Sequence, residues 1–214
     1  MVLKHVSTTD DKGWLQVKYM DGSTYPPLPQ FLHVDFIKTE TGRDYFKILE
    51  GKTLGKEASV KLKDDGGSYL ADGEVKLPSG QVHYVIETGE VWYRGEDDNT
   101  WIGPINTVTD PNNPAPIGTH DLEIPDEVHL IGERYLPESI YACNWFRIGH
   151  SGDRYFHPGT LSKGCVTVKD VPKWTDIYEY LIKRRKGDGQ SVGIIQIFSS
   201  TADRRSLLKP LKSL

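Results

Sequence analysis

Cys165 and the histidines that precede it are the residues of this chain whose types and spacing point to chemistry. A cysteine attacks carbonyl carbons as its thiolate, and a neighbouring imidazole can take the thiol proton and return it to a leaving amine. His150 lies 15 positions before Cys165, a separation that suits two neighbouring strands better than one helix face. The pattern predicts a nucleophile and its general base, brought together by a β-sheet.

The residues directly before the cysteine fit this chemistry. Gly164 has no side chain, so the backbone around Cys165 can approach a substrate closely, and its amides are candidates for an oxyanion hole. If residues 163–165 are extended, side-chain alternation places Lys163 on the same face as Cys165, where its positive charge would favour the thiolate. We expect Ser162 and Lys163 to contact the substrate.

His157 competes with His150 for the role of base, because it lies only eight positions before Cys165. Pro158 biases His157 toward extended geometry inside a loop, which supports a side chain less rigidly than a strand end. We therefore predict His150 as the base and His157 as a substrate-side group, with the reverse assignment open.

The elements around these residues read mainly as strands. Residues 145–150 and 165–168 form two β-rich stretches around a loop with glycine and proline, and residues 191–198 read as a buried strand. One amphipathic helix is predicted over 172–185, with Pro172 in its first turn. Its apolar residues, at i, i+3, i+4, i+7 and i+8, are Trp174, Ile177, Tyr178, Leu181 and Ile182.

A resemblance to a known family sharpens this interpretation. Ser162-Lys163-Gly164-Cys165-Val166 resembles the Ser-His-Gly-Cys-Val/Ile signature of L,D-transpeptidase (YkuD-type) catalytic domains, and Ile148-Gly149-His150-Ser151-Gly152 resembles their histidine strand. Pro116-Ile117-Gly118-Thr119-His120 resembles their Pro-Thr-Gly-Thr-Phe segment, so the similarity covers roughly residues 80–198. Two positions depart from the family: Lys163 replaces its usual histidine, and Thr167 stands where arginine or asparagine is common.

The resemblance implies a β-sandwich catalytic domain and acyl transfer from a peptidoglycan stem peptide. Cys165 would attack the carbonyl of the dibasic residue and form a thioester, His150 would act as base, and a main-chain carbonyl near Ser151 would orient its imidazole. The amides of Gly164 and Cys165 would hold the oxyanion. An amine acceptor would make the enzyme a transpeptidase, whereas water would make it a carboxypeptidase or endopeptidase. We expect no cofactor.

Three alternatives fit the same residues. A secreted effector would attack a competitor's wall with the same thiol chemistry, a hypothesis that follows from the diverged motif and from the lack of a visible signal. A cysteine peptidase acting on proteins would share the nucleophile and base. In a non-catalytic wall-binding module the cysteine and histidine would be structural.

The whole chain is predicted to be mainly β, with three parts. Residues 1–75 read as short strands between turn signals such as Thr41-Gly42, and form a small β domain of unknown role. Residues 76–198 form the catalytic domain, and residues 199–214 a C-terminal tail. The loop at 110–116, rich in proline and asparagine, is either a wall of the active groove or only a connection.

Composition excludes several classes of function. The 214 residues carry a net charge of -4, which argues against a nucleic-acid binder that relies on a general positive field. No apolar run approaches the roughly 20 residues that a membrane span needs, and no secretory signal is visible at the start. The start of the sequence fits a removed signal, a protein that stays inside the cell and export without a signal equally well, whereas the family resemblance implies a protein of the cell envelope or periplasm or a secreted one. The basic run 183–186 is attributed to the helix dipole rather than to a polyanion site.

Cys143 and the acidic segment that contains His120 and His129 have no predicted catalytic role. A disulfide between Cys143 and Cys165 is the less favoured alternative to two free thiols, and it would block the nucleophile. His120 and His129 lie near acids at 121, 123 and 126, yet without a metal-ligand spacing, so we expect solvated side chains and no metal.

Overall fold

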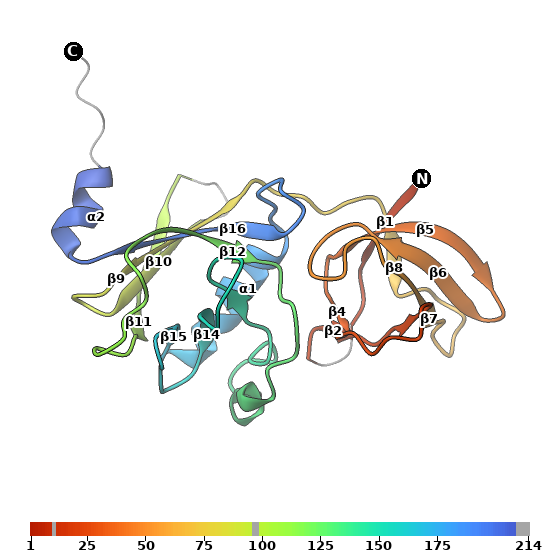
Figure 1. The fold of residues 1–214 in the computed structure, drawn as a ribbon, viewed down its shortest axis with the longest axis horizontal. Coiled ribbons are helices and arrows are strands. Elements are labelled where there is room, and N and C mark those ends of the chain that lie inside the picture. Colours follow the sequence, from red (N-terminus) through yellow and green to blue (C-terminus); the bar gives the residue numbers. More distant parts are fainter. Residues whose placement is uncertain (10–11, 96–98, 209–214) are drawn as a thin grey trace, which may run out of the picture.

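The computed structural model describes residues 1–9, 12–95 and 99–208. The predicted loop residues 96–98 and the tail residues 209–214 therefore lie outside the described part of the chain. Within the described residues the fold is mainly β, as predicted, and has two large sheets that follow one another along the chain, with a separate two-stranded pair beside the first (Figure 1).

The N-terminal sheet is antiparallel, with the strand order β3-β7-β6-β5-β1-β8. Its strands are β1 (Val2–Val6), β3 (Lys18–Tyr19), β5 (His33–Glu40), β6 (Arg43–Ile48), β7 (Glu57–Lys61) and β8 (Leu70–Asp72), beside a separate pair of β2 (Trp14–Leu15) and β4 (Leu28–Pro29). Thr41 and Gly42 both have positive φ, which is the geometry that joins two strands by a tight hairpin turn. Alternate residues such as Val34, Phe46 and Ile48 are fully buried and form the core of this sheet.

The C-terminal sheet has eight strands in the order β12-β16-β9-β10-β11-β15-β14-β13. Their bounds are β9 (Gly80–Val85), β10 (Glu90–Arg94), β11 (Trp101–Val108), β12 (Gly118–Glu123), β13 (Phe146–Arg147), β14 (Tyr155–Pro158), β15 (Val166–Val168) and β16 (Ser191–Phe198). A bridge between Leu122 and Ile148 connects the two ends of this order. The sheet therefore curves back on itself, and Figure 1 shows β14 and β15 below β12 and β16.

Helix α1 (Trp174–Ile182) lies inside this curve and is preceded by the 3-10 turn η2 (Val171–Lys173). The predicted helix exists, but α1 is shorter than the predicted range 172–185 at both ends. Trp174 packs edge-on against Phe156 of β14, with ring centroids 5.2 Å apart. This aromatic contact fixes β14 from its buried face, so the opposite face of β14 is held in place for the site described below.

The C-terminal elements add two further helical segments. The 3-10 helix η1 (Leu130–Tyr135) lies in the connection between β12 and β13. Helix α2 (Thr201–Leu208) occupies the tail and places the Arg204 guanidinium 3.8 Å from the Trp92 ring centroid. Among the described residues, no helix has the length and apolarity required to cross a membrane.

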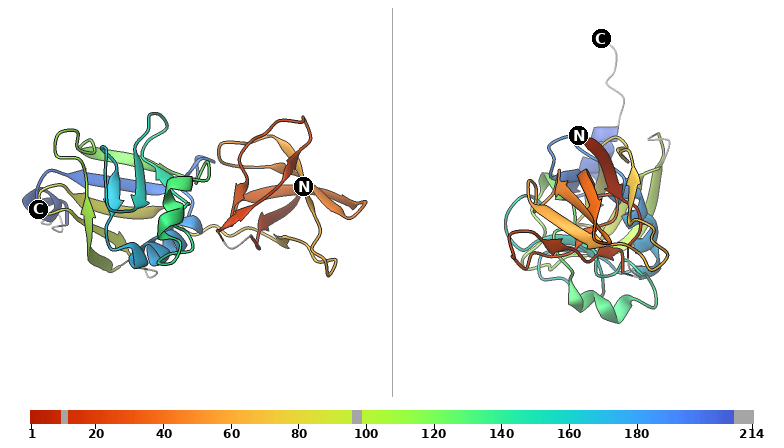
Figure 2. Two further views of the ribbon diagram at one scale, coloured as in Figure 1. Left: turned by 90° about the horizontal axis from the view of Figure 1, so that it is seen from below. Right: turned by 90° about the vertical axis from the view of Figure 1, so that its right-hand side faces the viewer.

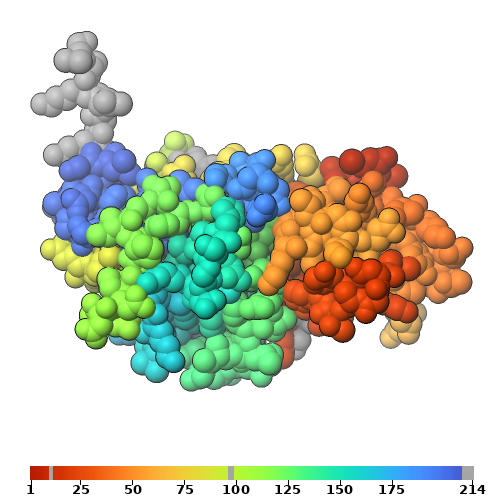
Figure 3. Space-filling view, in the orientation of Figure 1, coloured from red at the N-terminus to blue at the C-terminus, as the bar shows by residue number. Residues whose placement is uncertain are grey.

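The two sheets are joined by buried polar contacts. Arg185 follows α1, is 5% exposed, and donates to both carboxylate oxygens of Glu50 in the N-terminal sheet region at 2.8 and 2.7 Å. The Gly51 amide donates to the Gly189 carbonyl nearby. Figure 2 shows the two parts side by side, and the space-filling view of Figure 3 shows them in contact. Arg184 and Arg185 are thus interior residues and not part of an exposed basic run.

Candidate active site

The site is built on two neighbouring strands, β14 and β15, which run parallel. Phe156 pairs with Val166 and His157 with Thr167, so Cys165 comes directly before β15, opposite Tyr155. Phe156 and Val166 are fully buried in the core. Side chains alternate along strands, and Tyr155, His157 and Cys165 accordingly line one cavity on the other face.

We call this space the thiol cavity. Its volume is about 370 Å³, and its lining consists of Ile131, Arg134, Tyr135, Trp145, Asp153, Tyr155, residues 157–161, Lys163 and Cys165. His157 was expected in a loop, and this expectation is wrong, because His157 lies within β14 and is 6% exposed. The extended geometry that proline imposes on the preceding residue is the geometry of a strand.

The Cys165 thiol is half-buried and touches backbone groups. The Tyr155 amide donates to its sulfur at 3.4 Å, and the thiol donates to the Asp153 carbonyl at 3.8 Å. Burial raises the pKa of the Cys165 thiol, opposed by the Tyr155 amide and the Arg154 charge. The group therefore rests as a thiol near neutral pH. Cys165 and Cys143 are both free, as the favoured prediction stated.

The His157 ring is oriented by two hydrogen bonds. Its Nδ1 lies 2.9 Å from the Pro158 carbonyl, which can only accept, so Nδ1 carries the proton. Nε2 then has its lone pair free for the Thr167 hydroxyl at 3.0 Å. That hydroxyl also reaches the Leu161 carbonyl at 3.4 Å, so it can turn away from Nε2. Burial lowers the pKa of His157 to about 4 and keeps the ring neutral.

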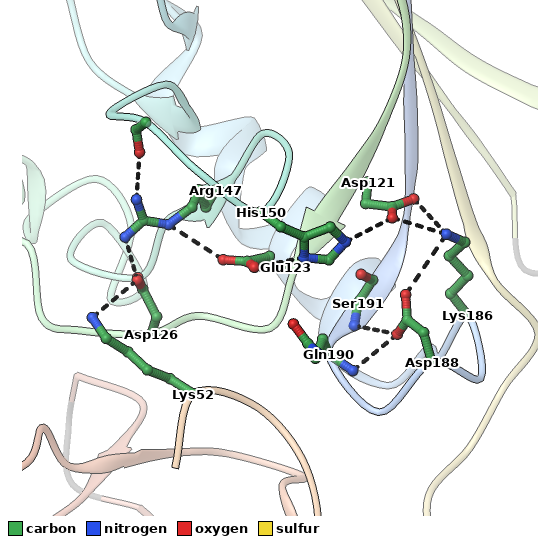
Figure 4. A network of polar contacts seen from close by, with 11 residues as sticks. Lys52, Asp121, Glu123, Asp126, Arg147, His150, Lys186, Asp188, Gln190 and Ser191 are labelled. Atoms are coloured by element: carbon green, nitrogen blue, oxygen red, sulfur yellow. Dashed lines mark hydrogen bonds and ion pairs between the residues drawn. The ribbon is translucent and has the colours of Figure 1, made fainter. Parts of the chain in front are cut away.

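His150 lies in a different cavity from Cys165, in the network shown in Figure 4. Its Nδ1 contacts Glu123 at 2.7 Å and its Nε2 contacts Asp121 at 2.8 Å. These two carboxylates raise the pKa of His150. Both ring nitrogens are thus engaged with acids, and the structure does not bring this predicted base together with the predicted nucleophile.

Lysine and arginine side chains complete the network around His150. Lys186 binds Asp121 at 2.7 Å, and Arg147 binds Glu123 at 3.2 Å and Asp126 at 2.5 Å. Ser151, predicted next to the catalytic histidine, is exposed in the bend that follows His150. The carbonyl that orients an imidazole beside the thiol belongs to Pro158.

Arg154, which sequence reasoning missed, anchors the loop that carries the cysteine. Its Nη1 donates to the carbonyls of Gly164 at 2.6 Å and Pro114 at 2.9 Å, and its Nη2 donates to the Asn113 side chain at 2.7 Å. The loop at 110–116 is therefore tied to the site through this residue. The signal available in the sequence was an arginine directly before an aromatic strand, which alone is weak.

Gly164 is required for packing as well as for its conformation. Its φ is +106°, and a Cβ there would lie 2.5 Å from Arg154 Nη1 and 2.8 Å from the Asn113 carbonyl. The condition that residues 163–165 are extended is not met, because β15 starts only at Val166 and this glycine turns the chain. The alternation argument that placed Lys163 beside Cys165 is therefore invalid.

Ser162 and Lys163 take different positions. The Ser162 hydroxyl donates to the Cys165 carbonyl at 2.8 Å and so closes the turn around the nucleophile. Lys163 is exposed and lines the thiol cavity. Lys163 and Cys165 thus line the same cavity, but they do not occupy neighbouring positions on one face of a strand.

Within the part of the chain that the structure describes, two groups of side chains bring metal-ligand atoms within 4.8 Å of one another, namely Asp121, His150 and Asp188, and Asp126, Glu127 and His129. In each group a lysine ammonium already contacts two carboxylates. Lys186 lies 2.7 Å from Asp121 and 3.7 Å from Asp188, and Lys52 lies 3.3 Å from Asp126 and 3.9 Å from Glu127.

The prediction of a solvated His129 is wrong. Its ring stacks on Trp145 at 4.1 Å and meets Tyr155 edge-on at 4.6 Å. Trp145 in turn stacks on His157 at 4.1 Å. His129, Trp145 and His157 therefore form a continuous stack, which holds the His157 ring against sideways movement.

Comparison with known proteins gives only structural likeness. No family model matches the chain, and no curated protein sequence matches it. Similar solved structures include L,D-transpeptidase 1 of Mycobacterium tuberculosis, with 11% identity, a TM-score of 0.39 and coverage of 86% of each chain. An L,D-transpeptidase from Mycobacterium smegmatis has 13% identity and a TM-score of 0.38, covering 78% of this chain and 99% of that one.

A mutant L,D-transpeptidase of Enterococcus faecium is also similar, with 13% identity, a TM-score of 0.34, and coverage of 72% of this chain and 74% of that one. At these values the likeness concerns the fold and leaves open which residues act.

Proposed function

We propose that this protein is a cysteine-dependent acyltransferase or hydrolase in which Cys165 is the nucleophile and His157 the base. The observation that carries the proposal is that both side chains line one cavity from adjacent parallel strands. The neutral His157 ring, with its proton fixed on Nδ1, presents the unprotonated nitrogen that a general base needs.

The proposed reaction has two stages. The Cys165 proton passes to His157 Nε2 as the sulfur forms a bond to the substrate carbonyl carbon, once the Thr167 hydroxyl has turned to the Leu161 carbonyl. The carbon–nitrogen bond then breaks, and His157 returns the proton to the departing amine. A second amine, or water, attacks the thioester and gives its proton to His157, and the thiol is restored when the carbon–sulfur bond breaks.

The substrate class in this proposal rests on the resemblance of residues 162–166 to the L,D-transpeptidase signature. It names peptidoglycan stem peptides as acyl donors and places the protein in the cell envelope or outside the cell. The proposal further divides the chain into a β domain at 1–75, a catalytic domain at 76–198 and a tail at 199–214. A secreted wall-attacking effector would use the same chemistry.

His150 is the second candidate for the base. The observation in its favour is that it is exposed on a bend near Asp153, whose carbonyl contacts the thiol. To reach the thiol it would have to leave both Asp121 and Glu123. His157 already lines the same cavity as Cys165, and a rotation of the Thr167 hydroxyl frees its lone pair, so the geometry favours His157.

The test compares wild type with Cys165→Ala, His157→Gln and His150→Gln, each incubated with purified tetrapeptide muropeptides. Product chromatography and intact mass would detect release of the terminal alanine and an acyl-enzyme. We expect no product from Cys165→Ala, a loss of about 100-fold or more from His157→Gln, and near wild-type turnover from His150→Gln. Turnover by folded Cys165→Ala would refute the nucleophile, and the reverse histidine result would make His150 the base.

A further inference from the structure

The segment between β12 and η1 carries three side chains that can ligate a metal ion, and we call them the 126–129 cluster. Asp126, Glu127 and His129 each place one ligand atom within 4.8 Å of the other two. The Asp126 side chain is buried, at 4% exposed, whereas that of Glu127 is 48% exposed. Ligand atoms that lie about 2 Å from one Zn²⁺ ion are roughly 3–4 Å apart. A small side-chain movement would therefore close the cluster around an ion that enters from the Glu127 side.

Two buried polar atoms of this cluster have no hydrogen-bond partner within the described residues, namely Asp126 Oδ1 and His129 Nε2. The other oxygen of Asp126, Oδ2, accepts from Arg147 at 2.5 Å and from Lys52 at 3.3 Å. A buried carboxylate oxygen or imidazole nitrogen without a partner costs free energy. A cation that both side chains bind would remove this cost.

The 126–129 cluster differs in this respect from the group around His150. There both ring nitrogens of His150 contact carboxylates, and Lys186 donates to both oxygens of Asp121 at 2.7 and 2.8 Å. In the 126–129 cluster the lysine contacts are longer, at 3.3 and 3.9 Å, and Lys52 is 47% exposed. Lys52 lies in the connection between β6 and β7, so its ammonium can leave without moving the cluster.

We propose that Asp126, Glu127 and His129 bind a divalent transition-metal ion, with Zn²⁺ as the best match, and that the Lys52 ammonium takes the place of the ion when no metal is bound. Zn²⁺ accepts imidazole nitrogen and carboxylate oxygen, with water completing a set of three protein ligands. Mg²⁺ and Ca²⁺ prefer oxygen alone. This assignment replaces the expectation of no metal, which assumed a solvated His129.

The three ligands lie outside the lining of the thiol cavity, so the metal site is independent of the proposed thiol chemistry. The two sites are nevertheless connected, because His129 stacks on Trp145, and Trp145 stacks on His157. A metal bound to His129 would hold the outer end of this stack.

The test is a calorimetric titration of the untagged protein with Zn²⁺ at pH 7.5, with Mg²⁺ titrated in parallel. All proteins carry Cys165→Ala, which removes the half-buried thiol as a competing ligand. We expect saturable binding of one Zn²⁺ per chain, and no comparable binding of Mg²⁺. Because Cys165→Ala lacks the proposed nucleophile, this result does not depend on the proposed function, which the muropeptide assay tests by itself.

Two half-exposed residues test the ligand set without disturbing the stacked His129 ring. Glu127→Gln should weaken Zn²⁺ binding about 10-fold or more, since it removes a charged ligand. Lys52→Met should tighten binding roughly 10-fold, because a competing positive charge is lost from the carboxylates. The control is His150→Gln, which removes the imidazole of the other group and should leave the affinity unchanged.

Three results would overturn the metal site. The first is the absence of saturable Zn²⁺ binding in protein shown to be folded by circular dichroism. The second is binding that His150→Gln abolishes and Glu127→Gln leaves intact, which would place the ion on the other group. The third is an affinity that Lys52→Met leaves unchanged or weakens, since the ammonium and the ion would then not compete for the same carboxylates.

Discussion

Arg154 combines two effects on the Cys165 thiol, since its charge favours the thiolate and its hydrogen bonds hold the loop. The charge lowers the pKa of Cys165, against the larger effect of burial, which raises it. Removing the charge must therefore raise the thiol pKa further. We predict that Arg154→Gln slows alkylation of Cys165 by iodoacetamide at pH 7.5 roughly threefold to tenfold, as one pKa unit corresponds to a tenfold change in thiolate.

Arg154→Lys distinguishes the two effects, because lysine keeps the charge but not the planar fork that reaches Gly164, Pro114 and Asn113. A pH profile of alkylation near wild type for Arg154→Lys, with a profile shifted to higher pH for Arg154→Gln, would assign the effect to charge. Superimposable profiles for wild type and Arg154→Gln would refute it. Cys143 is fully buried, and Cys143→Ala removes it as a second alkylation target.

Residue types single out Cys165 as the proposed nucleophile, but they do not reveal which histidine shares its cavity. Gly164, the β-branched strand after the cysteine, the upstream His150 and the family resemblance all point to Cys165. Strand geometry and the same resemblance favour His150, and Pro158 predicts that His157 lies in a loop. What places His157, and not His150, in the cavity with Cys165 is the parallel pairing of β14 with β15. No local pattern reveals which strands pair or in which register.

The pairing of β9 with β16 shows how closely two strands can approach when both carry glycine. Gly193 pairs with Gly80 in parallel, and a Cβ on Gly193 would collide with the Gly80 backbone. Backbone cannot move aside as a flexible side chain can. We predict that Gly193→Ala lowers the free energy of unfolding by roughly 1–3 kcal/mol or more, measured by urea denaturation.

Gly67→Ala is the matched control for this prediction. A Cβ there would meet chiefly the Asp65 side chain, at 2.9 Å, in an exposed loop. We expect a change of about 0.5 kcal/mol or less. Equal losses from the two substitutions would show that the close approach of β9 and β16 is not what limits position 193.

Elements with strong local signals were predicted well, and those fixed by tertiary contacts were not. The turn at Thr41-Gly42, the strand at 191–198 and the apolar stripe of α1 all follow from spacing and turn residues. The ends of α1 were wrong because Arg184 and Arg185 leave the helix to enter buried contacts. The sequence pattern does not predict β14 for a related reason. The packing of Trp174 from α1 against Phe156 stabilises this strand, and no local pattern reveals such a tertiary contact.

The buried ion pair of Glu50 and Arg185 links the N-terminal sheet to the C-terminal sheet. Both side chains are nearly inaccessible, and His33 lies 3.2 Å from the same carboxylate. Breaking such a pair from one side leaves an uncompensated charge in the interior. We predict that Arg185→Ala lowers the free energy of unfolding by about 3–5 kcal/mol, measured by denaturant titration. The neighbouring exposed Lys186 offers Lys186→Ala as a control with a smaller loss.

The same pair predicts how stability depends on pH. Burial raises the pKa of Glu50, but the hydrogen bonds from His33 and Arg185 lower it more, to about 2 from 4.5. A carboxyl with a depressed folded pKa stabilises the fold fully above its unfolded pKa, and this contribution is lost as pH falls toward the folded value. We expect unfolding free energy to decline between about pH 4.5 and 2.

Glu50→Gln provides the comparison for the acid range, because it removes the titrating group while keeping its shape. The variant should be less stable at neutral pH and show a shallower decline in acid. Parallel curves for the variant and wild type would mean that other carboxyls cause the acid loss.

The short connection between β14 and β15 has a consequence for how this protein can vary. Only residues 159–165 separate the two parallel strands, and within them Ser162 closes the turn and Gly164 fits against Arg154. An insertion or deletion of a single residue here would change the register of the thiol against the imidazole, whereas a loop such as 64–67 on the other sheet would absorb it. In a library of random indels selected for activity, this connection should therefore keep its length while its exposed side chains change.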